Sequence, residues 1–380
     1  MSAAAGGHRP HRIDRFLSVL PTSNGSDLHL AVGSPPILRL DGELERSRFR
    51  VLTEGDFENL VRPITPARLW ETFLECGDAD FAYQMGLEGR FRVNLFRQEH
   101  GGGAVFRLIP SRIPTCEELG LPGPISGLHS AQRGLVLVTG PTGSGKSTTL
   151  AAILDRVNKR LPYHVITIED PIEFVHTNDR SVFTQREIGN DVPSFAEGVK
   201  AAIREDPDCL LVGEMRDLET MRMALTAAET GLLVFATLHT NSAAKAVDRI
   251  IDAFPAAEQE EIRTVLAEVL RAVVAQQLLK KRERGRTPAY EILLGSTALS
   301  NAIREGKTGL INNQIQTGRA RGMIGMDQSL GELARQSVVA PEEALEHAFD
   351  KESFKTLLAS LPKEPRPAPA PAAAAPAGAR

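Results

Sequence analysis

A glycine-rich loop is the segment of this chain whose chemistry is clearest. Residues 140–147 read Gly-Pro-Thr-Gly-Ser-Gly-Lys-Ser, which fits the pattern G-x-x-x-x-G-K-[ST], between an apolar run and a helix-forming segment. Glycines let the backbone curl so that successive N–H groups point at one anion, and the following helix adds its partial positive charge. We therefore predict an ATP site in which Lys146 reaches the outer phosphates and Ser147 ligates Mg²⁺. The residues expected to bind the nucleotide in this loop are Gly140, Pro141, Thr142, Gly143, Ser144, Gly145, Lys146, Ser147 and Thr148.

Two later apolar runs end in acidic residues. The first is followed by Glu169 and Asp170, and the second, after Gly213, by Glu214. The carboxyl ends of parallel strands meet at one edge of a sheet, beside the phosphate loop, where carboxylates position water or metal ions. Many ATPases have aspartate where Gly213 stands, so metal ligation would rest on Ser147, on Glu214 through water, or on the first acidic pair. The alternative is that these acids cap helices or carry surface charge.

His239 ends the next apolar run, at 232–238. A single histidine is more often a hydrogen-bonded structural residue than a catalytic one. Its position at a strand end equally favours a sensor of the γ-phosphate. We expect Glu169, Glu214 and His239 to form the catalytic group.

The order of apolar segments predicts the fold that holds these residues. Strand-like runs lie at 135–138, 165–168, 209–212 and 232–238, and helix-forming segments between them include 147–159 and 218–229. Continuous apolar runs are typical of parallel strands buried on both faces, and their alternation with helices predicts a doubly wound α/β domain. A mainly helical region is expected near 256–275 and 297–360.

The N-terminal part has a different pattern. Residues 80–83, 90–97 and 104–109 alternate with period two, which predicts an antiparallel sheet. Helical spacing at 13–20 and at 57–73, the latter interrupted by two prolines, completes a small α+β domain. Short strands are expected on either side of the turn at 33–36, with a hairpin turn at Asp41 and Gly42.

Composition indicates where the two folded domains begin and end. A Pro- and Gly-rich linker is expected between the two domains, and a Pro- and Ala-rich tail has too few apolar side chains to fold. The predicted organisation is a disordered lead at 1–11, an N-terminal domain at 12–110, a linker at 111–128, an ATPase domain at 129–361 and a disordered tail at 362–380.

Charge and cysteine content exclude several classes of protein. The formal net charge is −4, without the basic excess of a protein that coats nucleic acid. The three cysteines are far apart, which argues against a disulfide scaffold or a thiolate zinc site. No run approaches the roughly 20 apolar residues of a membrane helix, and no secretory signal is visible. We expect a cytoplasmic protein that is not integral to a membrane and contacts no nucleic acid directly.

Several segments together resemble the secretion-superfamily motor ATPases, and within them the type IV pilus retraction ATPases. The matching segments are the phosphate loop, 166–176, 202–208, 211–220, 226–231, 236–240, 26–30 and 89–94. The resemblance covers roughly residues 12–320. It implies a PAS-like N-terminal domain, a RecA-like P-loop ATPase domain and a hexameric ring that contacts an inner-membrane platform protein from the cytoplasmic side.

The resemblance also implies roles for site residues. Glu169 would activate water, Glu214 would act with Mg²⁺, and His239 would sense the nucleotide state. Arginines of the N-terminal domain reach the nucleotide in this family, and the candidates here are Arg90, Arg92, Arg97 and Arg107. A guanidinium offsets charge on the transferring phosphoryl group, although alternating arginines are also typical of a solvated strand face.

Three further features bear on the kind of work performed. Pilus extension ATPases commonly carry a paired-cysteine zinc motif, which this chain lacks. The retraction family has an A-x-x-x-L-I-R-E element, matched here at 298–305 with Ala302 in place of leucine. That difference leaves an accessory retraction paralogue open as an alternative. The basic cluster at 280–286 leaves open a secretion or DNA-translocating motor, against a solvated turn. A non-hydrolysing scaffold is disfavoured by the joint presence of Lys146, Glu169 and Glu214.

Overall fold

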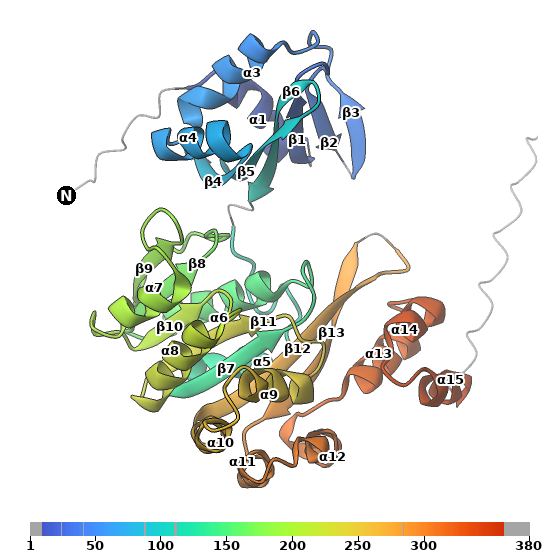
Figure 1. Ribbon diagram of the computed structural model, residues 1–380. Coiled ribbons are helices and arrows are strands. Elements are labelled where there is room, and N and C mark those ends of the chain that lie inside the picture. Colours follow the sequence, from blue (N-terminus) through green and yellow to red (C-terminus); the bar gives the residue numbers. More distant parts are fainter. Residues whose placement is uncertain are drawn as a thin grey trace, which may run out of the picture.

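The computed structural model describes residues 10–23, 25–40, 42–86, 89–109, 112–283 and 285–360. Most of the predicted lead, the whole of the predicted tail, Asp41 of the predicted hairpin turn, and Pro110 and Ser111 at the predicted domain boundary lie outside these residues. Figure 1 shows two units, the N-terminal one above the larger one that carries the phosphate loop.

The N-terminal domain is built on a six-stranded antiparallel sheet in the order β3-β2-β1-β6-β5-β4. Its strands are β1 (Gly25–Ala31), β2 (Ile37–Leu40), β3 (Glu43–Arg46), β4 (Asp78–Met85), β5 (Gly89–Gln98) and β6 (Gly101–Ile109). Strand alternation places Phe91, Val93 and Leu95, all fully buried, on the face that packs against the helices. Arg90 and Arg92 therefore lie on the opposite face of β5.

Short helices cover the apolar face of this sheet. They are α1 (Asp14–Leu17), α2 (Val19–Thr22), α3 (Glu54–Val61), the 3₁₀ helix η1 (Arg62–Ile64) and α4 (Ala67–Cys76). The predicted helix at 57–73 is interrupted near its prolines, as expected. Thr53 begins α3 with a reciprocal cap, in which its side chain accepts from the Asp56 N–H. The left-handed Gly77 ends α4.

A seven-stranded sheet forms the centre of the second domain, in the order β13-β12-β7-β11-β10-β8-β9. Its strands are β7 (Gly134–Thr139), β8 (His164–Glu169), β9 (Val182–Glu187), β10 (Cys209–Val212), β11 (Leu233–Leu238), β12 (Leu270–Lys280) and β13 (Arg286–Leu294). Neighbours from β12 to β9 pair in parallel, and β13 is antiparallel. The carboxyl ends of β7, β8, β10 and β11 therefore meet at one edge, as predicted.

Helices pack on both faces of this sheet. They are α6 (Lys146–Arg160), α7 (Phe195–Ala202), α8 (Leu218–Glu229), α9 (Ala243–Asp252) and α10 (Gln259–Val269), followed by α11 (Thr297–Arg304), η3 (Thr308–Leu310), α12 (Ile311–Thr317) and η4 (Arg319–Arg321). The expected helical region at 256–275 is too long, because the chain becomes strand at Leu270. Strands β7 and β13 supply the hydrogen bonds that extend residues 270–275.

The C-terminal helices α13 (Met326–Arg335), α14 (Pro341–His347) and α15 (Lys351–Ser360) lie beside the β12–β13 hairpin (Figure 1). Their core contains Leu330 and Phe354 together with Leu279 of β12. The second half of the predicted linker is folded as α5 (Gly123–Ser126) and η2 (Gly127–Ser130), and Ile125 is buried in the core of the ATPase domain. None of the helices that the structure describes has the length and apolar character needed to cross a membrane.

Candidate nucleotide-binding cleft

The glycine-rich loop connects β7 to α6, as its sequence context predicts. Gly140, Gly143 and Gly145 have φ angles of 146°, 78° and 89°, a conformation that only glycine adopts without strain. A Cβ atom at Gly140 would lie 2.2 Å from the carbonyl oxygen of Gln276, so the loop packs directly on β12. The tight backbone leaves the N-terminus of α6 open toward the carboxyl edge of the sheet.

Lys146 is folded onto this loop. Its Nζ atom donates to the carbonyl oxygens of Gly140 at 2.8 Å and Pro141 at 3.1 Å. Burial lowers the pKa of Lys146, while the carboxylates of Glu214 and Glu173 oppose that shift. The ammonium group is therefore held at the loop by neutral carbonyls, where an anionic phosphate would be a stronger partner.

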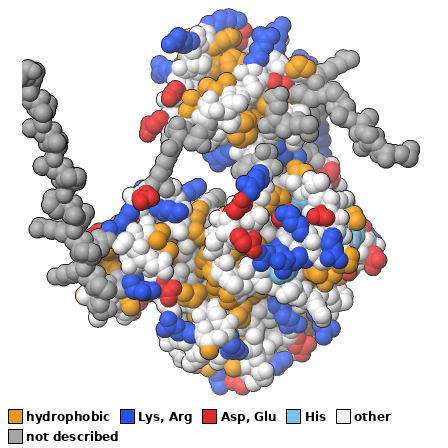
Figure 2. All heavy atoms as spheres, turned by 180° about the vertical axis from the view of Figure 1, so that it is seen from behind, with side chains coloured by type: hydrophobic (Ala, Val, Ile, Leu, Met, Phe, Trp, Pro, Cys, Tyr) orange, Lys and Arg blue, Asp and Glu red, His pale blue; other side chains and the backbone are white. Residues whose placement is uncertain are grey.

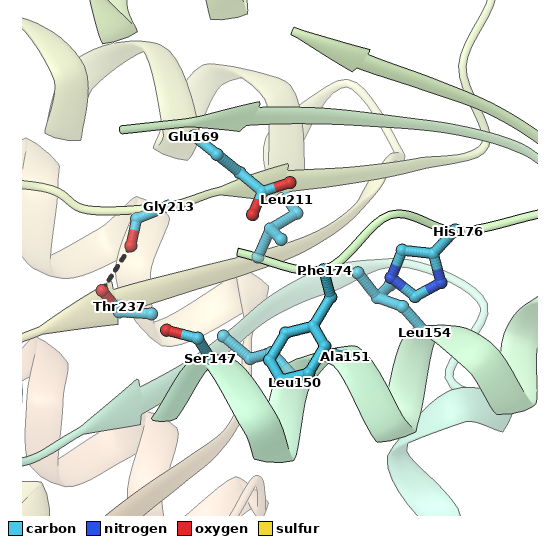
Figure 3. Close-up of a pocket in the computed structure, with 10 residues that line it drawn as sticks. All are labelled: Ser147, Leu150, Ala151, Leu154, Glu169, Phe174, His176, Leu211, Gly213 and Thr237. Atoms are coloured by element: carbon cyan, nitrogen blue, oxygen red, sulfur yellow. Dashed lines mark hydrogen bonds between the residues drawn. The ribbon is translucent and has the colours of Figure 1, made fainter. Parts of the chain in front are cut away.

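Glu169 ends β8 and faces the start of α6. Figure 3 shows its carboxylate pointing from the strand into the space above Ser147. A cavity of about 30 Å³ lies here, lined by Glu169, Ser147, Gly213 and Thr237 among others, with room for a water molecule. Burial, with a smaller contribution from Glu173, raises the pKa of Glu169 to about 7. A carboxyl group with such a pKa can exchange a proton near neutral pH.

Glu214 and His239 lie together at the ends of β10 and β11. The Nε2 atom of His239 is 2.8 Å from Oε1 of Glu214, and Nε of Arg216 donates to the same oxygen at 2.5 Å. Burial alone would raise the pKa of Glu214, but the hydrogen bond from Arg216 and the charge of His239 outweigh it and hold that pKa below its usual value. Glu214 is therefore a carboxylate at neutral pH, whereas Glu169 titrates there.

These groups line one cleft of about 610 Å³. Its walls include the loop residues 142–148 apart from Ser144, the three predicted catalytic side chains, and Arg92 of the N-terminal domain. Figure 2 shows Lys and Arg side chains on the underside of the N-terminal domain, where it faces the ATPase domain. One chain thus brings the loop, Glu169, Glu214, His239 and one of the four predicted arginines to the same opening.

The other three arginines are held elsewhere. Arg90 donates to Glu187 of the ATPase domain at 3.0 Å, with 21% and 5% of the two side chains exposed. Arg97 lies over the ring of Phe73, 5.6 Å from its centre, and Arg107 donates to Asp27 at 2.8 Å. Within one chain, Arg97 and Arg107 do not line the cleft, so contact with a nucleotide would require a neighbouring subunit.

Comparison with known proteins identifies the family. Residues 88–336, more than half of the chain, match the model of the type II/IV secretion system proteins. The chain belongs to this family. It is 47% identical over 342 residues to the type IV pilus retractation ATPase PilT of Pseudomonas aeruginosa, covering 90% of this chain and 99% of the relative.

Two further similarities place the chain within the family. It is 48% identical over 319 residues to a twitching motility protein of Neisseria gonorrhoeae, covering 84% of this chain and 85% of the relative. The crystal structure of the pilus retraction motor PilT with bound ADP shares 41% identity and a TM-score of 0.85, covering 92% of this chain and all of that one. The chain is accordingly an ATPase of the pilus retraction type, with a RecA-like P-loop domain and a smaller PAS-like α+β domain. The predicted fold class, enzyme class and family are confirmed.

The close approach of two strands explains why residue 213 is a glycine in this member of the secretion ATPase family. A Cβ atom there would lie 3.0 Å from the carbonyl oxygen of Ile168 and 3.2 Å from Cα of Glu169, closer than side-chain atoms normally approach. The carboxyl ends of β8 and β10 would therefore have to separate by a few tenths of an ångström to accommodate the aspartate that many ATPases carry at this position. Glu214 follows one residue later and lines the cleft together with Glu169.

Sequence inspection missed several residues around the cleft. Arg216, Arg286 and Glu173 line it. Thr167 and Gln185 hydrogen-bond to Glu169. The basic and acidic residues fall within or beside segments already singled out, but nothing in the sequence marks a threonine inside a strand or a glutamine on the next strand. Only strand pairing shows that these two contact Glu169.

Proposed function

We propose that this chain is the ATP-hydrolysing subunit of a hexameric ring that powers type IV pilus retraction and twitching motility. The observation that carries the proposal is the convergence of the phosphate loop, Glu169, Glu214, His239 and Arg92 on one cleft between two domains. In such a cleft, a change in the bound phosphate would alter contacts to both domains and so could shift one against the other. The similarity to retraction motors supports pilus retraction as the work performed.

Two glutamates with opposite pKa shifts divide the chemistry. Glu169, with its raised pKa and its carboxylate beside a water-sized cavity, is proposed to accept the proton of the attacking water. Glu214 stays ionised and is paired with His239. Loss of the γ-phosphate would change the hydrogen-bond partners of Glu214. His239, which is paired with Glu214 at the strand ends, would then change its position or its hydrogen bond in response.

The metal proposed for this site is Mg²⁺. The proposed protein ligands are two oxygen groups, the hydroxyl of Ser147 and the carboxylate of Glu214. So small a number suits Mg²⁺, because this ion keeps several water ligands and also binds phosphate oxygens. The described residues contain no cluster of three or more His, Cys, Asp or Glu side chains arranged to hold a metal, which agrees with a shared ATP–Mg²⁺ site. When bound, Mg²⁺ would neutralise phosphate charge.

The second wall of the site is proposed to come from a neighbouring subunit. Arg92 already lines its own cleft. Arg97 and Arg107 are both exposed, with 70% of the Arg107 side chain accessible, so a neighbouring subunit could contact them. ATP binding would shift the N-terminal domain of one subunit against the ATPase domain of the next. The ring would act in the cytoplasm, at an inner-membrane platform protein of the pilus machine.

The structure bears on the alternative motors. In the basic cluster at 280–286, Lys280 ends β12 and Arg286 begins β13 and lines the nucleotide cleft. Because Arg286 lines the nucleotide cleft, we infer that its partner is ATP rather than DNA. In the predicted A-x-x-x-L-I-R-E element, Ala302 lies on α11 and is 5% exposed, so a buried alanine replaces the leucine of the family. Deletion of the gene and observation of surface motility separates a principal motor from an accessory paralogue.

Steady-state phosphate release tests the enzymatic part directly. We expect Lys146→Ala to abolish hydrolysis and Glu169→Gln to lower kcat by at least about 100-fold while ADP still binds. Arg321→Ala, an exposed change away from the cleft, is the control and should retain full turnover. Wild-type turnover in Lys146→Ala would refute the site. Light scattering that shows only monomers with ATP present would refute the ring.

A further inference from the structure

Glu169 is held by two neighbouring side chains. The Oγ1 atom of Thr167 donates to Oε1 of Glu169 at 2.7 Å, and Nε2 of Gln185 donates to the same oxygen at 3.3 Å. The other carboxylate oxygen, Oε2, takes no part in either bond. Figure 3 shows the carboxylate turned toward the start of α6, where Ser147 lies.

Strand geometry creates this arrangement. Thr167 and Glu169 are two residues apart on β8, so their side chains leave the same face of the sheet. Thr167 is paired directly with Gln185 of the parallel strand β9. The three side chains therefore form a compact group at the end of two strands. Thr167 is fully buried, and Glu169 is the acceptor that the structure gives to its hydroxyl.

Gln185 is itself fixed by the segment that follows Glu169. Its Nε2 atom also donates to the carbonyl oxygen of Phe174 at 2.8 Å, and its Oε1 atom accepts from the backbone N–H of His176 at 2.7 Å. Rotation of this amide would break three hydrogen bonds at once. Gln185 thus joins the edge strand, residues 174–176 and the carboxylate into one rigid unit.

We propose that Thr167 and Gln185 are positioning residues for ATP hydrolysis, which hold Oε1 of Glu169 so that Oε2 is presented to the attacking water. This inference rests on the proposed function of Glu169. A long carboxylate side chain has three rotatable bonds, and two donors on one oxygen select a single orientation before substrate arrives. Removal of either donor leaves the carboxylate present but poorly oriented, which lowers kcat more than it changes nucleotide binding.

Paired substitutions of Thr167 give the cleanest test, because Gln185 also supports the backbone. Thr167→Val keeps the volume and the branched shape but removes the donor, whereas Thr167→Ser keeps the hydroxyl. Thr65→Val removes a buried hydroxyl of the N-terminal domain, which donates to Val61 at 2.9 Å, and serves as the matched control. Steady-state phosphate release and ADP titration are measured on the full chain, alongside Glu169→Gln.

We expect Thr167→Val to lower kcat by about 10- to 100-fold, with KM for ATP and the ADP affinity within about twofold of wild type. Thr167→Ser should recover most of the loss, and Thr65→Val should match wild type. The inference is overturned if Thr167→Val keeps wild-type kcat while Glu169→Gln is inactive. It is also overturned if Thr167→Val weakens ADP binding as much as it lowers kcat and Thr167→Ser does not recover activity. Wild-type turnover in Glu169→Gln would instead remove the proposed role of Glu169.

Discussion

The pH dependence of ATP hydrolysis follows from the environment of Glu169. Burial, assisted by Glu173, raises the pKa of Glu169 to about 7. A general base works only when deprotonated, so activity is expected to be low below this pKa and to rise as pH increases through it. A group with this pKa is about 10% ionised one pH unit below and about 90% one unit above, so kcat/KM should rise roughly tenfold across that interval.

Removing a donor to Glu169 should move this profile. The hydrogen bond from Thr167 stabilises the ionised carboxylate and lowers its pKa. A hydrogen bond to a charged group is worth roughly 1.5–3 kcal/mol, and about 1.36 kcal/mol corresponds to one pKa unit. Thr167→Val should therefore shift the rising limb to higher pH by about one to two units. Thr167→Ser should shift it far less.

The assay is phosphate release at ATP concentrations well below KM, with excess Mg²⁺ and constant ionic strength. The terminal phosphate of ATP titrates near pH 6 by itself, but it does so identically for every variant. The difference between the pH profiles of Thr167→Val and wild type therefore reports titration of the enzyme rather than of ATP. A wild-type profile without a limb near neutral pH, or identical profiles for the two proteins, would refute the assignment of this titration to Glu169.

Two further outcomes follow from packing. Gly213→Asp introduces the residue that is common in other ATPases. It should lower the free energy of unfolding by roughly 1–3 kcal/mol in a denaturant titration, because the new Cβ would lie 3.0 Å from the Ile168 carbonyl oxygen. Unchanged stability would show that the strand ends separate easily. Arg90 and Glu187 should show a coupling energy of about 1 kcal/mol in a double-mutant cycle measured by unfolding. Their ion pair joins the two domains and is largely shielded from water. Additive effects of the two single variants would exclude the pair as a stabilising contact.

Much of the ATPase fold could be predicted because its signals are local. The runs that became β7 and β10 are apolar throughout, those that became β8 and β11 are apolar apart from one threonine each, and α8 was predicted with the bounds that the structure has. The start of β12 was not predicted, because Leu270, Arg271 and Ala272 are all strong helix formers. Pairing with β7 and β13 makes these residues a strand, and the pairing with β7 joins residues more than 100 positions apart.

The candidate site shows the same division. Lys146 and Ser147 follow from a motif of eight consecutive residues, and Glu169, Glu214 and His239 follow from the rule that parallel strands end at a common edge. The arginines could not be sorted in this way. Alternation along β5 places Arg90 and Arg92 on one face, but the packing of the two domains gives Arg90 to Glu187 and Arg92 to the cleft.

The sequence by itself determined the phosphate loop, the sheet edge that carries the acidic residues, and the family, because each depends on residue types at short spacing. Only the tertiary structure decided how those residues are tuned. Burial raises the pKa of Glu169, while Arg216 and His239 lower that of Glu214. The donors that orient Glu169 likewise come from strand pairing. Electrostatic environment and orientation depend on which groups meet in space, and that information lies in contacts between segments rather than within any one of them.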